Sequence, residues 1–433
     1  MPFEFEAGAR RKIAVIGGGI SGMGAAWALS EHNDVTLIEA APRLGGHART
    51  KLAGKRGNQP VDTGFIVYNR VNYPNLVRFF EMLKVPVVPS DMSFGASIDG
   101  GRLEFSLANL QGIFAQKRNL VNLRYLAMLR DILRFNAGAE ASVAAYPDQT
   151  IGQLIQRMGL SDGFRDFYLA PMSGAIWSTP VDRILDFPAQ AMITFFKNHN
   201  LLQATGQHQW YTVAGGSVEY VNRLAEAMTR RGATIRLGAA VAGVRRWGLG
   251  SEVRCAGGAW ERFDDVVMAT HSDDSLKMLV DPTLPEREIL GAIRYQPNTV
   301  TLHADASLMP KRRSAWASWV YAEDKDASAD GIDLTYWMNN LQPIPHDDLH
   351  LVTLNTRRPI REELIYDQTV LRHPVYDLAA LAAQKRLAAV NGARNIWFCG
   401  AWTKNGFHED GLSSGLEVAA RIEQMRVRST AAA

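Results

Sequence analysis

The chain has 433 residues, of which 47% are hydrophobic and 21% charged, so it is long enough for two domains and is typical of a globular protein. Its formal net charge of +3, without a long basic run, argues against a nucleic-acid partner. The presence of only two cysteines, Cys255 and Cys399, excludes a disulfide framework and favours the cytoplasm. No run reaches the roughly 20 apolar residues that span a bilayer, so we expect a soluble or peripheral protein.

The first predicted elements are a strand at 12–16, a glycine turn at 17–22, a helix at 23–30 and a strand at 34–39. The turn has G-x-G-x-x-G spacing at Gly17, Gly19 and Gly22, with Ser21 inside it. Glycines there let the backbone approach a pyrophosphate at the helix N-terminus. Glu39 ends the second strand, where a carboxylate accepts hydrogen bonds from an adenosine ribose. The alternatives are a structural glycine turn and a solvated charge.

Two later stretches have a similar character. After Gly215-Gly216 the sequence predicts an amphipathic helix and then strands at 234–237, 241–246, 253–255 and 265–269. The last stretch has a strand at 395–399, which ends in Gly400, and a helix at 413–424. Long, aromatic-rich insertions lie between the three stretches, where a substrate domain would be placed.

The run Arg43-Leu44-Gly45-Gly46-His47-Ala48-Arg49-Thr50 follows the acidic strand end. At this point the chain resembles the flavin amine oxidase and phytoene desaturase superfamily. The resemblance implies an FAD cofactor, with Arg43, Gly45 and Gly46 at its phosphates and flavin edge. The family usually has Arg or Lys where this chain has His47, so His47 is either a titratable group beside the cofactor or a structural residue.

The resemblance extends along the chain, through Asp62-Thr63-Gly64-Phe65 and Gly215-Gly216 to Val241, which the family places against the adenine. Gly400 and Ala401 match an element in which the family has an acid, so Ala401 removes one expected hydrogen bond to the ribitol. Gly411 and Leu412 match the start of the family's last helix, whose backbone amides face the flavin pyrimidine ring.

These features together predict an α/β protein with a Rossmann-like FAD-binding domain built from discontinuous segments and an α+β substrate domain. We assign residues 10–75, 212–275 and 390–425 to the FAD-binding domain, and residues 76–211 and 276–389 to the substrate domain. The histidines and cysteines lack the spacing of metal ligands, so no metal site is expected. Cys399 is interpreted as a buried small hydrophobe, and FAD is expected to be noncovalent.

His408 and Glu409 lie immediately before the last helix. Amine oxidases place an aromatic wall of the substrate cage at the position of His408. A histidine there is the leading candidate for an acid or base beside the flavin, with Glu409 and His47 after it. The alternative is that the run His408-Glu409-Asp410 only caps the helix and solvates the loop.

Three further segments, Asp91–Phe94, Tyr336–Leu341 and Gly406–Gly411, resemble a bacterial family of predicted FAD-binding proteins associated with cyclopropane-fatty-acid-synthase-like methyltransferases. This resemblance implies an FAD-dependent oxidoreductase that desaturates or oxidises a modified fatty acyl chain of a phospholipid. The alternatives are an amine oxidase and a nonredox flavoprotein such as an isomerase. The family's flavin-side lysine has no counterpart in Pro297–His303, which disfavours amine chemistry.

An amphipathic helix is predicted over residues 117–135. It places Arg124, Arg130 and Arg134 within an arc of about 120°, at 100° per residue. A basic helix of this kind lies either on an anionic membrane or as a solvated surface helix on the core. The sequence does not indicate an oligomeric state.

Overall fold

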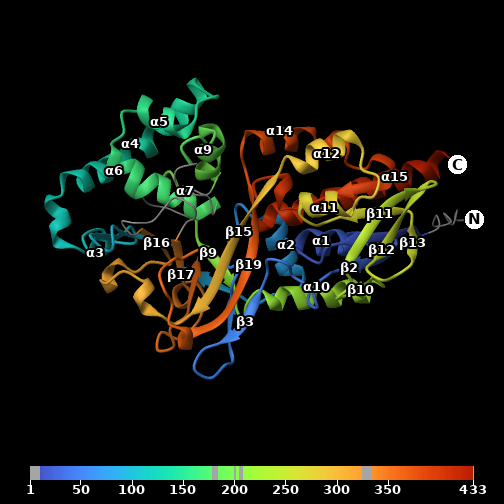
Figure 1. Cartoon of the computed structure of the whole chain (residues 1–433), viewed down its shortest axis with the longest axis horizontal. Helices are drawn as coiled ribbons and strands as arrows, with labels where there is room; N and C mark the ends of the chain where they lie inside the picture. Colours follow the sequence, from blue (N-terminus) through green and yellow to red (C-terminus); the bar gives the residue numbers. More distant parts are fainter. Residues whose placement is uncertain (1–9, 178–183, 199–200, 204–207, 324–332, 433) are drawn as a thin grey trace, which may run out of the picture.

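A parallel sheet draws its strands from distant parts of the sequence (Figure 1). The computed structural model describes residues 10–177, 184–198, 201–203, 208–323 and 333–432. Within these ranges, five strands form this sheet with all neighbours parallel. Its order is β10 (Thr234–Arg236), β2 (Asp34–Ile38), β1 (Lys12–Ile16), β14 (Asp265–Met268) and β20 (Ile396–Phe398).

Both faces of the parallel sheet are covered, which explains why its strands are apolar at nearly every position. Ile13 and Val15 of β1 pack on one side in a cluster with residues of helices α1, α2, α10 and α15. Ala14 and Ile16 pack on the other side with residues of an antiparallel sheet and of helices α11, α12 and α14. The bounds of these elements are α1 Ile20–Leu29, α2 Pro74–Met82, α10 Val218–Arg230, α15 His408–Ala432, β11 Val241–Trp247, β12 Gly250–Cys255, β13 Trp260–Phe263, α11 Ser272–Met278, α12 Leu284–Gly291 and α14 Leu378–Arg386.

A mixed sheet forms the centre of the other half of the molecule. Among the described residues it has seven strands, and β16 pairs in parallel with β7 while the other neighbours are antiparallel. Its order is β19 (Ile365–Val375), β15 (Arg294–His303), β18 (Leu351–Leu354), β17 (Asp333–Trp337), β16 (Trp319–Glu323), β7 (Phe94–Ile98) and β8 (Leu103–Ser106). Helix α13 (Met338–Leu341) follows β17. The long strands β15 and β19 connect the two halves of the molecule in Figure 1.

Smaller sheets accompany the parallel sheet and the mixed sheet. The strands β3 (Thr50–Ala53) and β4 (Gln59–Asp62) form a hairpin. A second small sheet has the order β5 (Val67–Asn69), β9 (Trp210–Val213) and β6 (Val87–Ser90).

A helical lobe packs against the mixed sheet, at the left of Figure 1. Its helices are α3 (Leu110–Ile113), α4 (Leu123–Ala145), α5 (Ile151–Arg157), α6 (Asp162–Phe164), α7 (Ala170–Trp177) and α9 (Ala189–Asn198). None of the helices in the described ranges is both long and apolar enough to cross a bilayer.

The prediction of a single helix over residues 117–135 is wrong for its first turn. Residues Lys117–Val121 form a separate 3₁₀ turn, and α4 begins at Leu123 because the side chain of Asn122 accepts a hydrogen bond from the Tyr125 amide. Each arginine of the basic face expected on this helix has a carboxylate partner. Arg124 pairs with Asp166, and Arg130 and Arg134 both pair with the buried Asp131.

The fold confirms the predicted class, an α/β protein with a parallel sheet from discontinuous segments and a second, mixed sheet. Two further predicted helix starts differ from the structure. Helix α1 begins at Ile20 rather than Met23, because the end of the glycine turn is its first turn. Helix α15 begins at His408 rather than Ser413, because Asp410 accepts a hydrogen bond from the Phe407 amide and stabilises an earlier start.

Asp62, which is 1% exposed, joins the two halves of the molecule. Its carboxylate accepts hydrogen bonds from Thr50 Oγ1 at 2.6 Å, from the amide and hydroxyl of Ser217 at 2.9 and 2.7 Å, and from Gln342 Nε2 at 3.0 Å. Burial raises the pKa of Asp62 to about 6, against the opposing effect of these donors. The segment Asp62–Phe65, which resembles the family, therefore begins at this junction between the two halves.

Replacing Asp62 with alanine is expected to lower the free energy of unfolding by roughly 3 kcal/mol or more. The substitution leaves several buried donors without an acceptor, at about 1–3 kcal/mol each. Urea denaturation monitored by tryptophan fluorescence measures this loss. The matched control is Asp34→Ala, which removes an exposed ion pair with Arg10 and should change stability by about 1 kcal/mol at most. Equal losses in the two variants would contradict the role of Asp62.

Candidate cofactor and active site

The glycine turn between β1 and α1 leaves an open cradle. Gly17 has φ +108°, and a Cβ on Gly22 would lie 1.9 Å from the Gly17 oxygen, so the turn closes tightly on itself. A Cβ on Gly19 would meet no atom within 4 Å. No side chain caps α1, so its first amides remain available to an anion in front of Gly19. Ser21, in the first turn of α1, is buried.

Glu39 fixes the edge of this cradle. One carboxylate oxygen accepts a hydrogen bond from the Gly18 amide at 2.5 Å, and the other accepts from the Ala41 amide at 2.7 Å. The backbone of Glu39 also pairs with residues 236 and 239, which brings the start of β11 and Val241 to the end of β2. Each carboxylate oxygen still has a lone pair for a ribose hydroxyl. Glu39 and Val241 therefore lie on the same side of the cradle.

The loop after β2 closes over the glycine turn. The Gly45 amide donates to the Gly18 oxygen at 2.8 Å, and a Cβ on Gly46 would lie 3.1 Å from the Cα of Gly19. Arg43 is exposed, and its guanidinium donates to the oxygens of Leu44, Gly46 and Ala48 at 2.9–3.1 Å. These bonds hold the loop in shape, a function that the sequence did not reveal for Arg43.

The C-terminal segment packs against the same helix. A Cβ on Gly411 would lie 3.0 Å from Ser21 Oγ, and a Cβ on Gly415 would lie 2.1 Å from the Ser21 oxygen, so both glycines let α15 approach α1. The Gly400 amide donates to Ser414 Oγ at 2.9 Å, which places Ala401 beside this contact. Leu412 is fully buried against Gly24. Because α15 starts at His408, the Gly411 amide already donates to the Phe407 oxygen.

His408 behaves as an aromatic ring in this structure. It stacks on Phe65 with ring centres 3.9 Å apart and an interplanar angle of 12°. Burial lowers the pKa of His408 to about 3, so the imidazole is neutral at physiological pH. Its Nε2 lies 2.6 Å from the hydroxyl of Tyr220, so the two groups share a hydrogen bond, and burial raises the pKa of that hydroxyl well above 10. This arrangement favours a wall rather than a base.

Glu409 has a different environment from the one expected for an acid or base. Its carboxylate accepts hydrogen bonds from the amides of Asn75 and Leu76 at 3.0 Å and from the side chain of Asn75 at 2.6 Å. These residues form the first turn of α2, so Glu409 caps that helix. The arrangement favours a structural role for Glu409.

His47 belongs to a group of histidines that lie between the glycine loop and the strands β15 and β19. Its ring centre is 5.7 Å from that of His271 and 5.4 Å from that of His373. Desolvation lowers the pKa of His47, and Arg43 and Arg372 lower it further. Nε2 lies 3.1 Å from the Arg372 oxygen, so Nε2 carries the proton and the lone pair lies on Nδ1. Among the described contacts, no partner occupies this lone pair.

The buried histidines predict a strong dependence of stability on pH. Burial lowers the pKa of His408, His271 and His373 to about 3, against about 6.5 in the unfolded chain. Between these values the unfolded state binds more protons, so each group's contribution is complete above pH 6.5 and is lost as the pH falls. The free energy of unfolding should decrease by about 1.4 kcal/mol per pH unit for each such group. Urea titrations from pH 7 to pH 4 test this, and a flat profile would contradict neutral burial.

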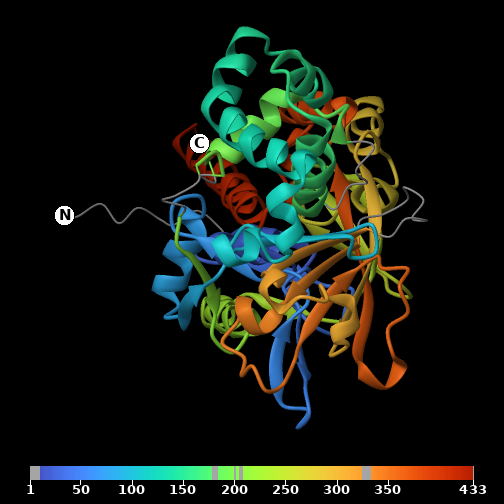
Figure 2. The same cartoon turned by 90° about the vertical axis from the view of Figure 1, so that its left-hand side faces the viewer.

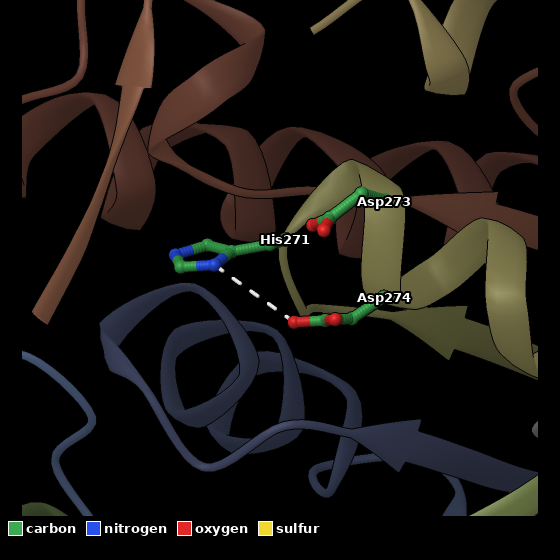
Figure 3. Close-up of side chains that lie close together, drawn as sticks. All are labelled: His271, Asp273 and Asp274. Atoms are coloured by element: carbon green, nitrogen blue, oxygen red, sulfur yellow. Dashed lines mark ion pairs between the residues drawn. The ribbon is translucent and has the colours of Figure 1, made fainter. Parts of the chain in front are cut away.

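A group of His271, Asp273 and Asp274 at the start of α11 has the composition of a cation site (Figure 3). Its negative charge is already balanced, because Arg372 and Lys277 both pair with the two carboxylates. His271 is neutral, so its approach to Asp274 at 3.9 Å is not an ion pair at neutral pH. We interpret the group as an ion-pair network that orients Arg372.

The residues present fit an adenine dinucleotide. The open space at Gly19, the uncapped α1 and the carboxylate of Glu39 match the needs of a pyrophosphate and a ribose. Sequence reasoning missed Phe65, Tyr220 and His373, which approach the predicted residues only through tertiary contacts. A signal existed for Phe65 alone, because it follows the Asp62–Gly64 segment that resembles the family.

Comparison with known proteins agrees with this geometry. The flavin containing amine oxidoreductase model matches residues 20–310, which is more than half of the chain. An FAD-dependent oxidoreductase from Emericella nidulans, dbaF, is 38% identical over 103 residues, which cover 23% of this chain and 21% of that protein. The matched segment therefore spans about a fifth of the length of that relative.

Solved structures show the same fold over nearly the whole chain. A fatty acid isomerase from P. acnes has a TM-score of 0.66 and 13% identity, and covers 95% of this chain and 98% of its own. Cyclohexylamine oxidase from Brevibacterium oxydans has a TM-score of 0.65 and 16% identity, and covers 96% and 100%. From the match over residues 20–310, we conclude that the chain belongs to the flavin-containing amine oxidoreductase family.

Proposed function

We propose that this protein is an FAD-dependent oxidoreductase that desaturates or otherwise oxidises a fatty acyl chain of a phospholipid. The observation that carries this proposal is a pair of stacked aromatic contacts at the start of α15. His408 stacks on Phe65, and the adjacent Phe407 stacks on Phe195 of α9 with ring centres 4.8 Å apart. Phe407 packs against the apolar core of the lobe. Aromatic and apolar side chains of this kind suit a long apolar substrate.

A buried donor that packs against the same helical lobe is compatible with an acyl ligand. Trp319 packs against the core of the lobe and lies 5.0 Å, ring centre to ring centre, from Tyr336. Its indole Nε1 is buried and donates to no atom of the described residues. A buried N–H normally has an acceptor, and the ester oxygen of an acyl lipid is a suitable one. The fold also serves a fatty acid isomerase in P. acnes, which is compatible with an acyl substrate.

Several groups of this chain would hold the cofactor. The α1 amides and Gly19 would bind its pyrophosphate, Glu39 its ribose and Val241 its adenine, while Gly45, Gly46 and the α15 segment would border the flavin. When bound, FAD supplies the hydride acceptor. Cys399 is fully buried, and burial raises the pKa of its thiol to about 12, so it is a poor attachment point and FAD is expected to be noncovalent.

Proton removal is assigned to His47. Its neutral imidazole has a lone pair on Nδ1, because Nε2 donates to the Arg372 oxygen, whereas the ring of His408 is stacked on Phe65 and hydrogen-bonded to the Tyr220 hydroxyl. His408 is assigned to the aromatic wall, where a neutral stacked ring excludes water from the acyl chain. Glu409 is assigned to the stability of the α2 start.

Mass spectrometry of lipids from cells with and without the gene tests the substrate. The proposal expects acyl chains that differ by two hydrogens between the two samples. Identical lipids together with an altered amine pool would favour an amine oxidase. A rearranged acyl chain without loss of hydrogen would favour a nonredox isomerase.

A further inference from the structure

The segment from α3 to the start of α4 exposes an unusual amount of apolar surface. Leu110 is 75% exposed, Leu120 is 54%, Val121 is 79% and Leu123 is 81%. Single exposed leucines are common on protein surfaces, but a concentration in one short stretch indicates an interaction site. Figure 2, which views the left-hand side of Figure 1, shows this segment in cyan toward the viewer, in front of the helical lobe.

Two polar residues of the same segment face inward while its leucines are exposed. Gln116 and Asn119 are each 1% exposed. Gln116 Nε2 donates to the Gly101 oxygen at 3.0 Å, and Asn119 Nδ2 donates to the Glu104 oxygen at 3.3 Å, so both side chains bind the hairpin of β7 and β8. These bonds hold the turn Lys117–Val121 in place and fix Leu120 and Val121 outward. The apolar face is therefore built into the fold rather than left by a loose loop.

Basic side chains lie at the turn end of the same hairpin. Arg118 donates to the Arg102 oxygen, and Lys311 Nζ donates to the Gly100 oxygen at 3.3 Å, so both lie on the same hairpin. In the described part of the chain, Lys117, Arg118 and Lys311 form no ion pair. The nearest carboxylates are otherwise engaged, since Asp99 pairs with Arg102 and the buried Glu104 pairs with Arg312. We name Lys117, Arg118, Lys311, Leu110, Leu120, Val121 and Leu123 the hairpin-end surface.

A surface that combines exposed apolar side chains with cations that form no described ion pair complements one kind of partner in particular. The acyl region of a bilayer accepts leucines, while anionic headgroups accept lysine and arginine at the same depth. We propose that the hairpin-end surface docks the protein on an anionic phospholipid bilayer. The arginines on α4 are not counted in this surface, because each of them already pairs with Asp131 or Asp166. The inference does not depend on the chemistry of the acyl substrate.

Flotation of the purified full-length protein with vesicles tests the proposal. We expect binding to phosphatidylcholine vesicles that contain phosphatidylglycerol, and release as salt rises, because screening shortens to about 8 Å at physiological strength. The double variant Lys117→Glu and Arg118→Glu should lose at least roughly 25-fold in vesicle affinity, at about fivefold for each removed charge. The pair Leu120→Ser and Leu123→Ser should lose roughly tenfold or more.

The matched control reverses two exposed charges elsewhere, Arg230→Glu on α10 and Arg287→Glu on α12, and should bind vesicles as the wild type does. An equal loss in this control, or equal wild-type binding to pure phosphatidylcholine, would overturn the proposal. It would also be overturned if the surface variants changed the oligomeric state in sedimentation velocity without changing vesicle binding, since the surface would then join two copies of the chain. Vesicle binding is measured without turnover, so this test can fail while the proposed oxidoreductase function stands.

Discussion

Replacing His47 with glutamine is expected to slow anaerobic reduction of the bound flavin by about 10² to 10⁴-fold, the usual contribution of a positioned base. Glutamine keeps a donor for the Arg372 oxygen but has no basic nitrogen at the position of Nδ1. The variant should therefore stay yellow and folded while the reduction step becomes slow. Stopped-flow absorbance with excess acyl substrate measures the rate directly.

The matched variant is His408→Phe, which preserves a flat ring against Phe65 and removes only the bond to Tyr220. We expect its reduction rate to stay within about tenfold of the wild type, since losing one hydrogen bond costs roughly 1 kcal/mol. The wild-type rate should be constant above neutral pH and fall at acid pH, where His47 with its lowered pKa becomes protonated. A loss of rate confined to the His408 variant would return the role of base to His408.

Alanine substitutions at two glycines of the α1 turn should both weaken FAD binding, but they should differ in their effect on the stability of the apoprotein. In Gly22→Ala the new Cβ would lie 1.9 Å from a backbone oxygen, which forces the turn apart and should lower thermal stability as well as remove the flavin. In Gly19→Ala the Cβ would meet nothing within 4 Å, so the apoprotein should be as stable as the wild type. The same methyl would occupy the proposed pyrophosphate space and should weaken FAD by about 10 to 100-fold, at 1.4 kcal/mol for each factor of ten.

Flavin fluorescence titration and thermal unfolding of the apoprotein separate these effects. The Gly19 variant gives the stronger test, because a loss of FAD affinity without a loss of apoprotein stability requires that FAD binds at the cradle. Unchanged FAD affinity in Gly19→Ala would place the pyrophosphate elsewhere. Retained stability in Gly22→Ala would mean that the turn relaxes more easily than the backbone contact implies.

The cofactor half of the fold could be predicted because its signals are local. Continuously apolar strands, the glycine turn and the acidic strand end together identify the first βαβ unit, and the predicted bounds of β1 match the observed Lys12–Ile16. The resemblance at Arg43–Thr50 then identified the family, which the match over residues 20–310 confirms. The helix starts were less certain because Ile20 and His408 begin their helices within turns whose residues favour loops.

The environment of the candidate site could not be predicted, because it depends on contacts between distant segments. Nothing in the sequence near His408 indicates that Tyr220, 188 positions away, occupies its Nε2. The sequence presents Glu409 as an unpartnered acid, and only the structure shows that it binds the start of α2. The same holds for Asp131, which is buried and pairs with two arginines of the basic face that a helical wheel predicts. A sequence shows which side chains are charged, but it does not show which distant residues pair with them.

The most direct test of the account is the anaerobic absorbance spectrum of the purified flavoprotein mixed with an acyl phospholipid. We expect the oxidised flavin band to bleach, with loss of two hydrogens from the acyl chain per flavin, and to return when an electron acceptor is added. An amine should leave the band unchanged. Bleaching by amines but not by lipids, or conversion of the lipid while the flavin stays oxidised, would contradict the proposal that this protein oxidises an acyl chain.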